Sequence, residues 1–125
     1  MSTVNSTLQI TVGFPPSTNN LYANVRGRRV KTQEAREYAE HVSRVAWLWT
    51  KLHGDPPLPP YRLTITLYPG NGRRIDASNG IKCLEDGLFT GLEMNDRTVD
   101  EVTCRFGERD PLNPRAVVLL EHMEV

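Results

Sequence analysis

The most regular feature of the sequence is an apolar stripe that runs from Ala35 to Leu52. Its apolar residues recur at intervals of three and four, the period of a helix with one buried face. Thr32 is a natural N-cap, and Glu34 follows in the first turn, where the helix dipole favours an acid. A glycine and a proline-rich connection between residues 53 and 60 end the pattern. The sequence therefore predicts one long helix, whose apolar stripe comprises Ala35, Tyr38, Ala39, Val42, Val45, Ala46, Trp49 and Leu52.

Three other segments, Leu8–Val12, Tyr61–Leu67 and Val102–Phe106, alternate apolar and polar residues with the period of a half-buried strand. The continuous apolar run Ala116–Leu120 fits a strand buried on both faces. A second helix is expected from about Ala77 to Phe89. The order β-α-β-α-β-β predicts an α+β fold, a mixed sheet with two main helices packed on it.

Length and composition favour a single domain over residues 1–125. Lys and Arg total 15 and Asp and Glu total 15, so any nucleic-acid binding must come from uneven placement of charge. Cys83 and Cys104 have no metal-ligand spacing and are most simply interpreted as small buried residues. No signal peptide and no apolar run of roughly 20 residues is seen, so a cytoplasmic protein with no membrane partner is expected.

Charge is placed unevenly near the first helix. The segment from Leu21 to Val30 is expected to form a hairpin or a mobile loop. Four bases cluster in and directly after it without an acid, and three glutamates follow at Glu34, Glu37 and Glu40. The cluster fits either a grip on a nucleic-acid backbone or a solvated charged loop. Its members are Arg26, Arg28, Arg29 and Lys31.

A second polar stretch runs from a Gly-rich basic loop, with Arg73 and Arg74, into the second helix. Asp76 and Ser78 suit either N-capping or catalysis, and a further acid, Asp96, precedes the next strand. Asn79, Lys82 and Asp86 share one helix face at spacings of three and four. Lys82 and Asp86 also fit an ordinary surface pair.

Three patterns in this order resemble the RusA family of Holliday junction resolvases. They are Pro-Pro-Ser-x-Asn-Asn, Arg-Arg-x-Asp-x-x-Asn-x-x-Lys-x-x-x-Asp-x-Leu and Asn-Asp-x-x-Val, and the resemblance spans nearly the whole chain from Phe14. It places Asn19 and Asn20 in a loop near the active site, although turn chemistry alone also explains them.

The resemblance implies a RusA-like endonuclease that acts as a homodimer on a branched four-way DNA junction. Asp76 and Asp96 would belong to an acidic cluster that holds Mg²⁺, with Mn²⁺ as a substitute, and Lys82 would act on the scissile phosphate. Arg73 and Arg74, with Asn79, would bind DNA at the cut, and the upstream basic cluster would bind a more distant backbone segment.

The chain departs from the family pattern in two places. Ser78 stands where the family has a second aspartate, and Asn95 replaces the first residue of an Asp-Asp pair. Each change removes a negative charge from the expected metal shell while keeping a neutral oxygen ligand. Compensation is expected from other acids, with Glu101 ranked above Asp100 because it lies on the less apolar face of its strand; the further candidates are Glu85 and Asp86.

Three functions therefore follow from the sequence. The first is a Mg²⁺-dependent endodeoxyribonuclease that resolves Holliday junctions by paired symmetric nicks in recombination and repair. The second is a junction-binding protein of the same fold whose catalysis is weakened or lost. The third is a small α+β interaction domain without a DNA role, which predicts no salt-sensitive binding to nucleic acid.

Overall fold

The computed structural model describes residues 4–16, 22–70, 78–94 and 99–124. Within them the element order confirms the α+β prediction and adds a short hairpin ahead of the first helix. The elements are β1 (Thr7–Gly13), β2 (Tyr22–Val25), β3 (Arg28–Lys31), α1 (Gln33–His53), β4 (Tyr61–Tyr68), α2 (Ser78–Gly91), β5 (Val99–Phe106) and β6 (Arg115–His122).

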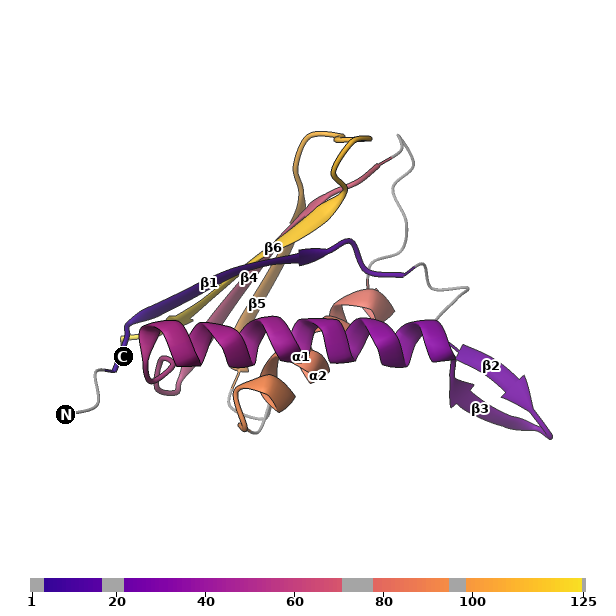
Figure 1. Ribbon diagram of the computed structural model, residues 1–125, viewed down its shortest axis with the longest axis horizontal. Helices are drawn as coiled ribbons and strands as arrows, with labels where there is room; N and C mark the ends of the chain where they lie inside the picture. Colours follow the sequence, from indigo (N-terminus) through magenta and orange to yellow (C-terminus); the bar gives the residue numbers. More distant parts are fainter. Residues whose placement is uncertain (1–3, 17–21, 71–77, 95–98, 125) are drawn as a thin grey trace.

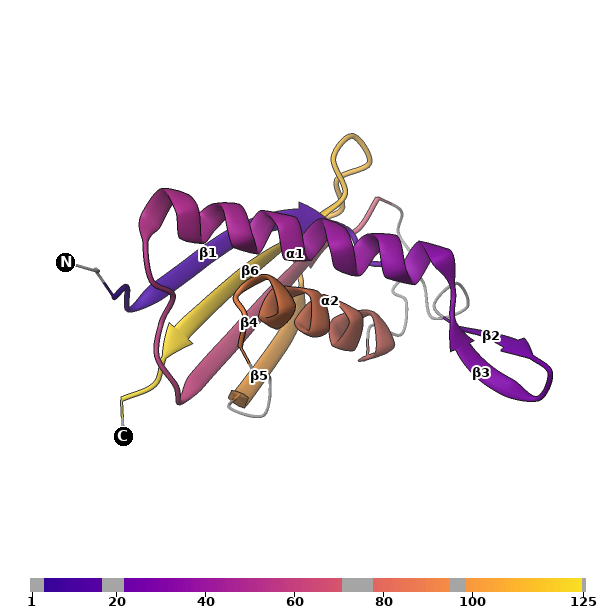
Figure 2. The same cartoon turned by 60° about the horizontal axis from the view of Figure 1, so that its bottom comes forward.

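Four strands form one mixed sheet in the order β1-β6-β4-β5. β6 is antiparallel to both β1 and β4, whereas β4 and β5 are parallel. A parallel pair needs a crossover connection, and α2 provides it. Both helices lie on the same side of the sheet, so the domain has two layers (Figure 1). Figure 2 shows α1 running past β1. α2 lies over β4, where the rings of Phe89 and Tyr61 are in contact.

The first helix begins and ends where the sequence predicts. The Thr32 side chain accepts a hydrogen bond from the Ala35 N–H, and Gly54 closes the helix at φ 95° with its N–H donating to the Thr50 carbonyl. Positive φ favours glycine at this cap. The Tyr38 hydroxyl donates to the Gly13 carbonyl at 2.7 Å, which ties α1 to the end of β1. No helix in the described part of the chain is long and apolar enough to cross a membrane.

The two helices approach closely because α2 has two glycines on its inner face. A Cβ at Gly87 would lie 2.6 Å from the Ala39 carbonyl oxygen, and a Cβ at Gly91 would overlap the Ser43 carbonyl oxygen. A larger side chain at either position would push the helices apart. The two glycines therefore set the depth of the groove between α1 and α2.

The core lies between the helices and one face of the sheet. Every second residue of β1, β4 and β6 is buried there. The other face has no covering layer among the described residues, so Val117 and Leu119 are only half-buried. The prediction that 116–120 is buried on both faces is therefore wrong, although the strand itself is confirmed and lies between two neighbours. The largest fully buried side chains are Tyr61, Phe89, Leu8, Leu63, Ile65, Leu67, Leu84, Leu88, Leu120, Val42 and Val118.

β5 differs from the other strands of the sheet. It lies at an edge, and its six central residues are exposed on both faces. Val102 is 45% exposed although it points to the helix side, as Leu63 beside it does. Cys83 is buried as expected, but Cys104 is exposed, because the helix layer does not cover this edge. The prediction of a buried Cys104 is therefore wrong.

The hairpin β2–β3 projects from the N-terminal end of α1, away from the sheet (Figures 1 and 2). Its turn residues Arg26 and Gly27 both have positive φ, 52° and 77°, as a two-residue hairpin turn requires. Of the two structures expected for this segment, a hairpin and a mobile loop, the segment forms the hairpin.

Candidate functional site

The predicted catalytic aspartates, Asp76 and Asp96, lie outside the described residues, as do Arg73 and Arg74. The predicted loop residues Asn19 and Asn20 lie outside them as well, and so does Asn95. Ser78 and Asn79 belong to the first turn of α2.

The described neighbours of Asp76 are Gly70, just beyond the carboxyl end of β4, and Ser78, the first residue of α2. A strand carboxyl end leading into a helix N-terminus is a common place for anionic ligands, because the helix presents free N–H groups there. Lys82 follows one turn later on α2 and is exposed, so its ammonium group is accessible to a ligand.

The described neighbours of Asp96 lie at the other end of β4. The Met94 sulfur lies 3.5 Å from the Tyr61 hydroxyl, and Val99 pairs with Tyr61 in the sheet. Tyr61 is the first residue of β4, a strand of eight residues. Eight residues span about 23 Å, so the flanks of the two aspartates are separated by roughly that distance within one chain.

The C-terminal cap of α2 holds Met94 near Tyr61, at the start of β4. The Met94 N–H donates to the Phe89 carbonyl at 2.8 Å and the Glu93 N–H donates to the Thr90 carbonyl at 3.1 Å. Glu93 has φ 58°, so the pattern is a Schellman cap with glutamate where glycine is usual. The cap turns the chain toward the start of β4, away from the N-terminal turn of α2.

Lys31 and Asp86, predicted for different roles, contact each other. Their Nζ and Oδ2 atoms are 3.4 Å apart, and they line a hollow of about 390 Å³ between α1 and α2. Cys83 lies one turn earlier on α2, where burial raises the pKa of its thiol; the Lys31 charge opposes this rise and the Asp86 charge adds to it. The contact between Lys31 and Asp86 therefore connects the end of β3 to α2.

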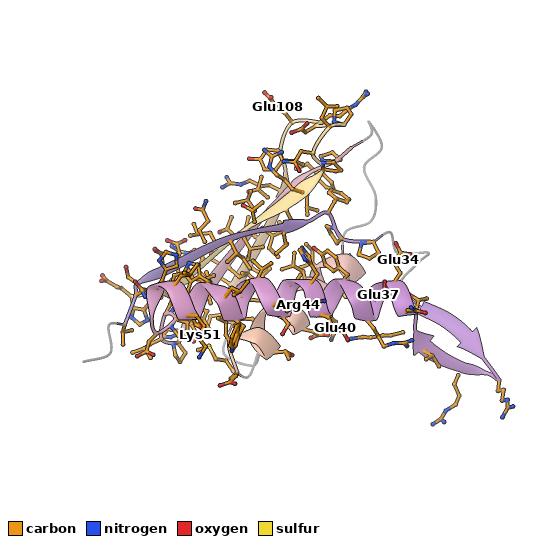
Figure 3. The ribbon with its side chains drawn as sticks, viewed as in Figure 1. Glu34, Glu37, Glu40, Arg44, Lys51 and Glu108 are labelled. Atoms are coloured by element: carbon orange, nitrogen blue, oxygen red, sulfur yellow. The ribbon has the colours of Figure 1, made fainter. Side chains whose placement is uncertain are left out.

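A second contact holds the base of the hairpin. The Arg36 guanidinium donates to the Lys31 carbonyl at 2.8 Å. Arg26 and Arg28 are exposed at and beside the turn, away from these contacts. Figure 3 shows Glu34, Glu37 and Glu40 on the N-terminal half of α1. Glu40 lines the same hollow as Lys31. The side chain of Arg29 is outside the described set.

Glu101, a candidate metal ligand from the sequence, forms an ion pair with Arg62. Its Oε2 lies 2.9 Å from Nε of Arg62, on the sheet face that carries no helices. Asp86 lies on α2, on the opposite side of the sheet, so the structure does not bring these two candidate ligands together. Within the described residues no group of three or more His, Cys, Asp and Glu side chains is arranged to hold a metal ion.

The contacts of Lys31 with Asp86 and of Arg62 with Glu101 were missed from the sequence. The partners are separated by 55 and 39 residues, and no local spacing connects them. The strand register places Arg62 beside Glu101, so a correct alignment of β4 with β5 is the one signal that identifies that pair.

Comparisons with known proteins identify one family. The family model described as Endodeoxyribonuclease RusA matches residues 13–121, most of the chain. No curated protein matches. A similar solved structure is 2C-methyl-D-erythritol 2,4-cyclodiphosphate synthase from Plasmodium vivax, with 10% identity, a TM-score of 0.34, and coverage of 95% of this chain and 97% of that one. A similarity at that TM-score carries no functional argument.

Proposed function

The chain belongs to the RusA endodeoxyribonuclease family, and we propose from this that it resolves four-way junctions by two symmetric, Mg²⁺-dependent nicks. The observation that carries the proposal is the family match over residues 13–121. As a member of this family the chain is an endodeoxyribonuclease that acts on Holliday junctions.

The proposed metal ligands are Asp76 and Asp96, with the Ser78 hydroxyl as a neutral third oxygen. Hard oxygen ligands of this kind suit Mg²⁺, and Mn²⁺ accepts them as well. The bound ion would activate water and neutralise charge at the phosphate. Asp86 and Glu101 are each within 3.4 Å of a base and lie on opposite sides of the sheet, so at most one of them adjoins a common ion.

The remaining polar residues have separate roles in the proposal. Lys82, exposed on the first half of α2, stabilises the negative charge that develops on the scissile phosphate. Arg73, Arg74 and Asn79 hold the phosphates next to the cut. The hairpin bases contact a more distant backbone segment without reading sequence. Two such sites in a two-fold homodimer match the approximate symmetry of the junction.

A second candidate function has one specific observation in its favour. Ser78 and Asn95 each replace a carboxylate of the family pattern, which removes two negative charges from the proposed metal shell. A junction-binding protein with weakened catalysis would retain the basic hairpin and the fold. It would bind junctions more tightly as salt falls and would cut them slowly or not at all.

The deciding experiment is cleavage of a synthetic four-way junction at several Mg²⁺ and Mn²⁺ concentrations, with a linear duplex as the control substrate. The parent chain should nick the junction, and Asp76→Asn and Asp96→Asn should each abolish nicking while leaving junction binding measurable. Full activity in both variants would remove the site assignment. A parent chain that binds but does not cut, and a Ser78→Asp variant that does cut, would establish the second function instead.

A further inference from the structure

We propose that Asp86 is a positioning residue, which holds the hairpin β2–β3 at a fixed place relative to Lys82 on the same helix. It acts through Lys31, the last residue of β3, whose Nζ lies 3.4 Å from the Asp86 carboxylate. The proposal rests on the proposed function for the contacts of the hairpin and of Lys82 with DNA. It assigns to Lys31 a link between two elements and not a phosphate contact.

The main chain of Lys31 is fixed to the first turn of α1. Its carbonyl oxygen accepts a hydrogen bond from the Arg36 guanidinium at 2.8 Å, and the Thr32 carbonyl accepts one from the Arg36 N–H at 3.1 Å. The Thr32 hydroxyl accepts from the Ala35 N–H and so caps the helix. The hairpin therefore leaves α1 from an ordered first turn.

The side chain of Lys31 reaches across to the other helix. α2 lies close to α1 here, since a Cβ at Gly87 would lie 2.6 Å from the Ala39 carbonyl oxygen. Asp86 precedes this glycine and lines the hollow between the helices together with Lys31. The two charged side chains are 41% and 32% exposed, so the pair is partly withdrawn from solvent. Lys31 is thus bonded to α1 through its main chain and to α2 through its side chain.

A second lysine lies near Asp86 in the sequence. Lys82 precedes it by four residues on the same face of α2, a spacing at which opposite charges often pair. Among the described residues, however, the ion-pair partner of Asp86 is Lys31. The Asp86 carboxylate therefore holds the base of the hairpin, and the exposed ammonium group of Lys82 stays accessible one turn away.

This link determines the distance between two proposed DNA contacts. Arg26 and Arg28 are exposed at and beside the turn of the hairpin, and Lys82 lies on α2. One DNA molecule has to engage both places. A hairpin that is already held in place loses little freedom when DNA binds, whereas a hairpin that swings on α1 has to be ordered during binding, which weakens the complex.

A variant with unchanged net charge separates the link from general electrostatics. In Lys31→Met/Asp86→Asn the ion pair is lost and the two lost charges cancel. Junction binding, measured in EDTA so that no metal takes part, should weaken by about fivefold, the most that a partly exposed ion pair commonly contributes to an equilibrium. The slope of log affinity against log salt should not change, whereas loss of a phosphate contact by Lys31 would lower it by about 0.9.

Two further variants keep the same net charge. The exchange Lys31→Asp/Asp86→Lys rebuilds the ion pair in the reverse direction and should restore the parental affinity. The matched control, Glu40→Gln/Arg44→Met, removes another ion pair that lines the hollow, with its charged atoms 4.0 Å apart. Because that pair connects two turns of one helix, its loss should leave the affinity unchanged. Circular dichroism of each variant checks that the fold is retained.

Junction cleavage distinguishes this role of Asp86 from that of a metal ligand. Loss of the link should raise KM by the same factor as it weakens binding, and should leave unchanged the Mg²⁺ concentration that gives half of the maximal rate. Loss of a metal ligand would raise that Mg²⁺ concentration. The exchange with Lys31 would not reverse such a loss, because it places a lysine in the metal shell.

Four results would each overturn the proposal: unchanged affinity without the ion pair, a loss that the exchange does not reverse, a salt slope lowered by about 0.9, or an equal loss in the control. The binding measurements need no cleavage. A chain that binds the junction without cutting it would therefore disprove the proposed nuclease and leave this test intact. A chain that cuts with the same KM with and without the ion pair would keep the nuclease and remove the link.

Discussion

Tyr38 belongs to the apolar stripe of α1 and also bonds to the end of β1. The helical stripe predicts that it is buried, and the structure adds its hydroxyl bond to the Gly13 carbonyl. Burial raises the pKa of Tyr38 well above its ordinary value, and burial also raises the pKa of Tyr61. Both hydroxyls are therefore neutral in the folded protein at a pH where an exposed tyrosine ionises.

The first prediction concerns stability at alkaline pH. Below about pH 10 both tyrosines are protonated in the folded and unfolded states and contribute no pH dependence. Above it the unfolded state loses protons that the folded state retains, so the free energy of unfolding falls as pH rises, by up to about 1.4 kcal/mol per pH unit for each tyrosine.

Tyr38→Phe removes one of these contributions, so its stability should fall less steeply with pH than that of the parent. At pH 7 it should be about 1 kcal/mol less stable, because the Gly13 carbonyl loses a donor. Urea unfolding at several pH values measures both effects. An unchanged alkaline slope in Tyr38→Phe would contradict the role assigned to its burial.

The caps of α1 could be predicted from the sequence, whereas the ion pair between Lys31 and Asp86 could not. Thr32 and Gly54 could be identified as the ends of α1 because capping depends on neighbours three or four residues away. Lys31 and Asp86 could not be paired, because their contact depends on how the hairpin and α2 meet. The motifs suggested two separate roles for residues that form one ion pair.

At the scale of elements, the hairpin β2–β3 is the feature most easily connected to DNA. It projects from the body, its base is fixed by Arg36 and by the Lys31–Asp86 contact, and its turn carries exposed arginines. A fixed projection with accessible positive charge suits contact with a phosphate backbone.

We expect Arg26→Gln with Arg28→Gln to weaken junction binding without changing the fold, because both side chains are exposed. Loss of two phosphate contacts should reduce the slope of log affinity against log salt by about 1.8. Fluorescence anisotropy with a labelled junction at several salt concentrations measures both quantities. Arg109→Gln, exposed in the connection between β5 and β6, is the matched control. An effect of this single change half as large as that of the double change would indicate that only total charge matters.

Element types were largely predictable, whereas their exposure was not. Alternation identified β1, β4 and β5 because a strand with one buried face has a period of two. The same alternation gave the wrong exposure for Cys104, because a pattern shows which face is apolar but not whether anything in the same chain covers it. For β6 the continuous apolar run indicated a strand correctly and burial on both faces incorrectly.

For the whole molecule, the question is how one site obtains both of its proposed aspartates. The described flanks of Asp76 and Asp96 lie at opposite ends of β4, a strand of eight residues. In the proposed homodimer, a cation shared between Asp76 of one chain and Asp96 of the other would account for a site that contains both aspartates.

Subunit mixing tests this arrangement. Asp76→Asn and Asp96→Asn should each be inactive alone, but a mixed dimer would contain one site with both aspartates and one site with neither. After denaturation and joint refolding, about half of the dimers are mixed, so about a quarter of the parental sites should be restored. Single nicking of the junction should return to that extent. Paired resolution should not, because no mixed dimer has two complete sites.

The control mixes Asp76→Asn with the double variant Asp76→Asn/Asp96→Asn, for which shared sites predict no recovery. Sedimentation of the mixture, with one variant carrying a fluorescent label, confirms that mixed dimers form. Mixed dimers without any nicking would mean that each chain uses its own two aspartates.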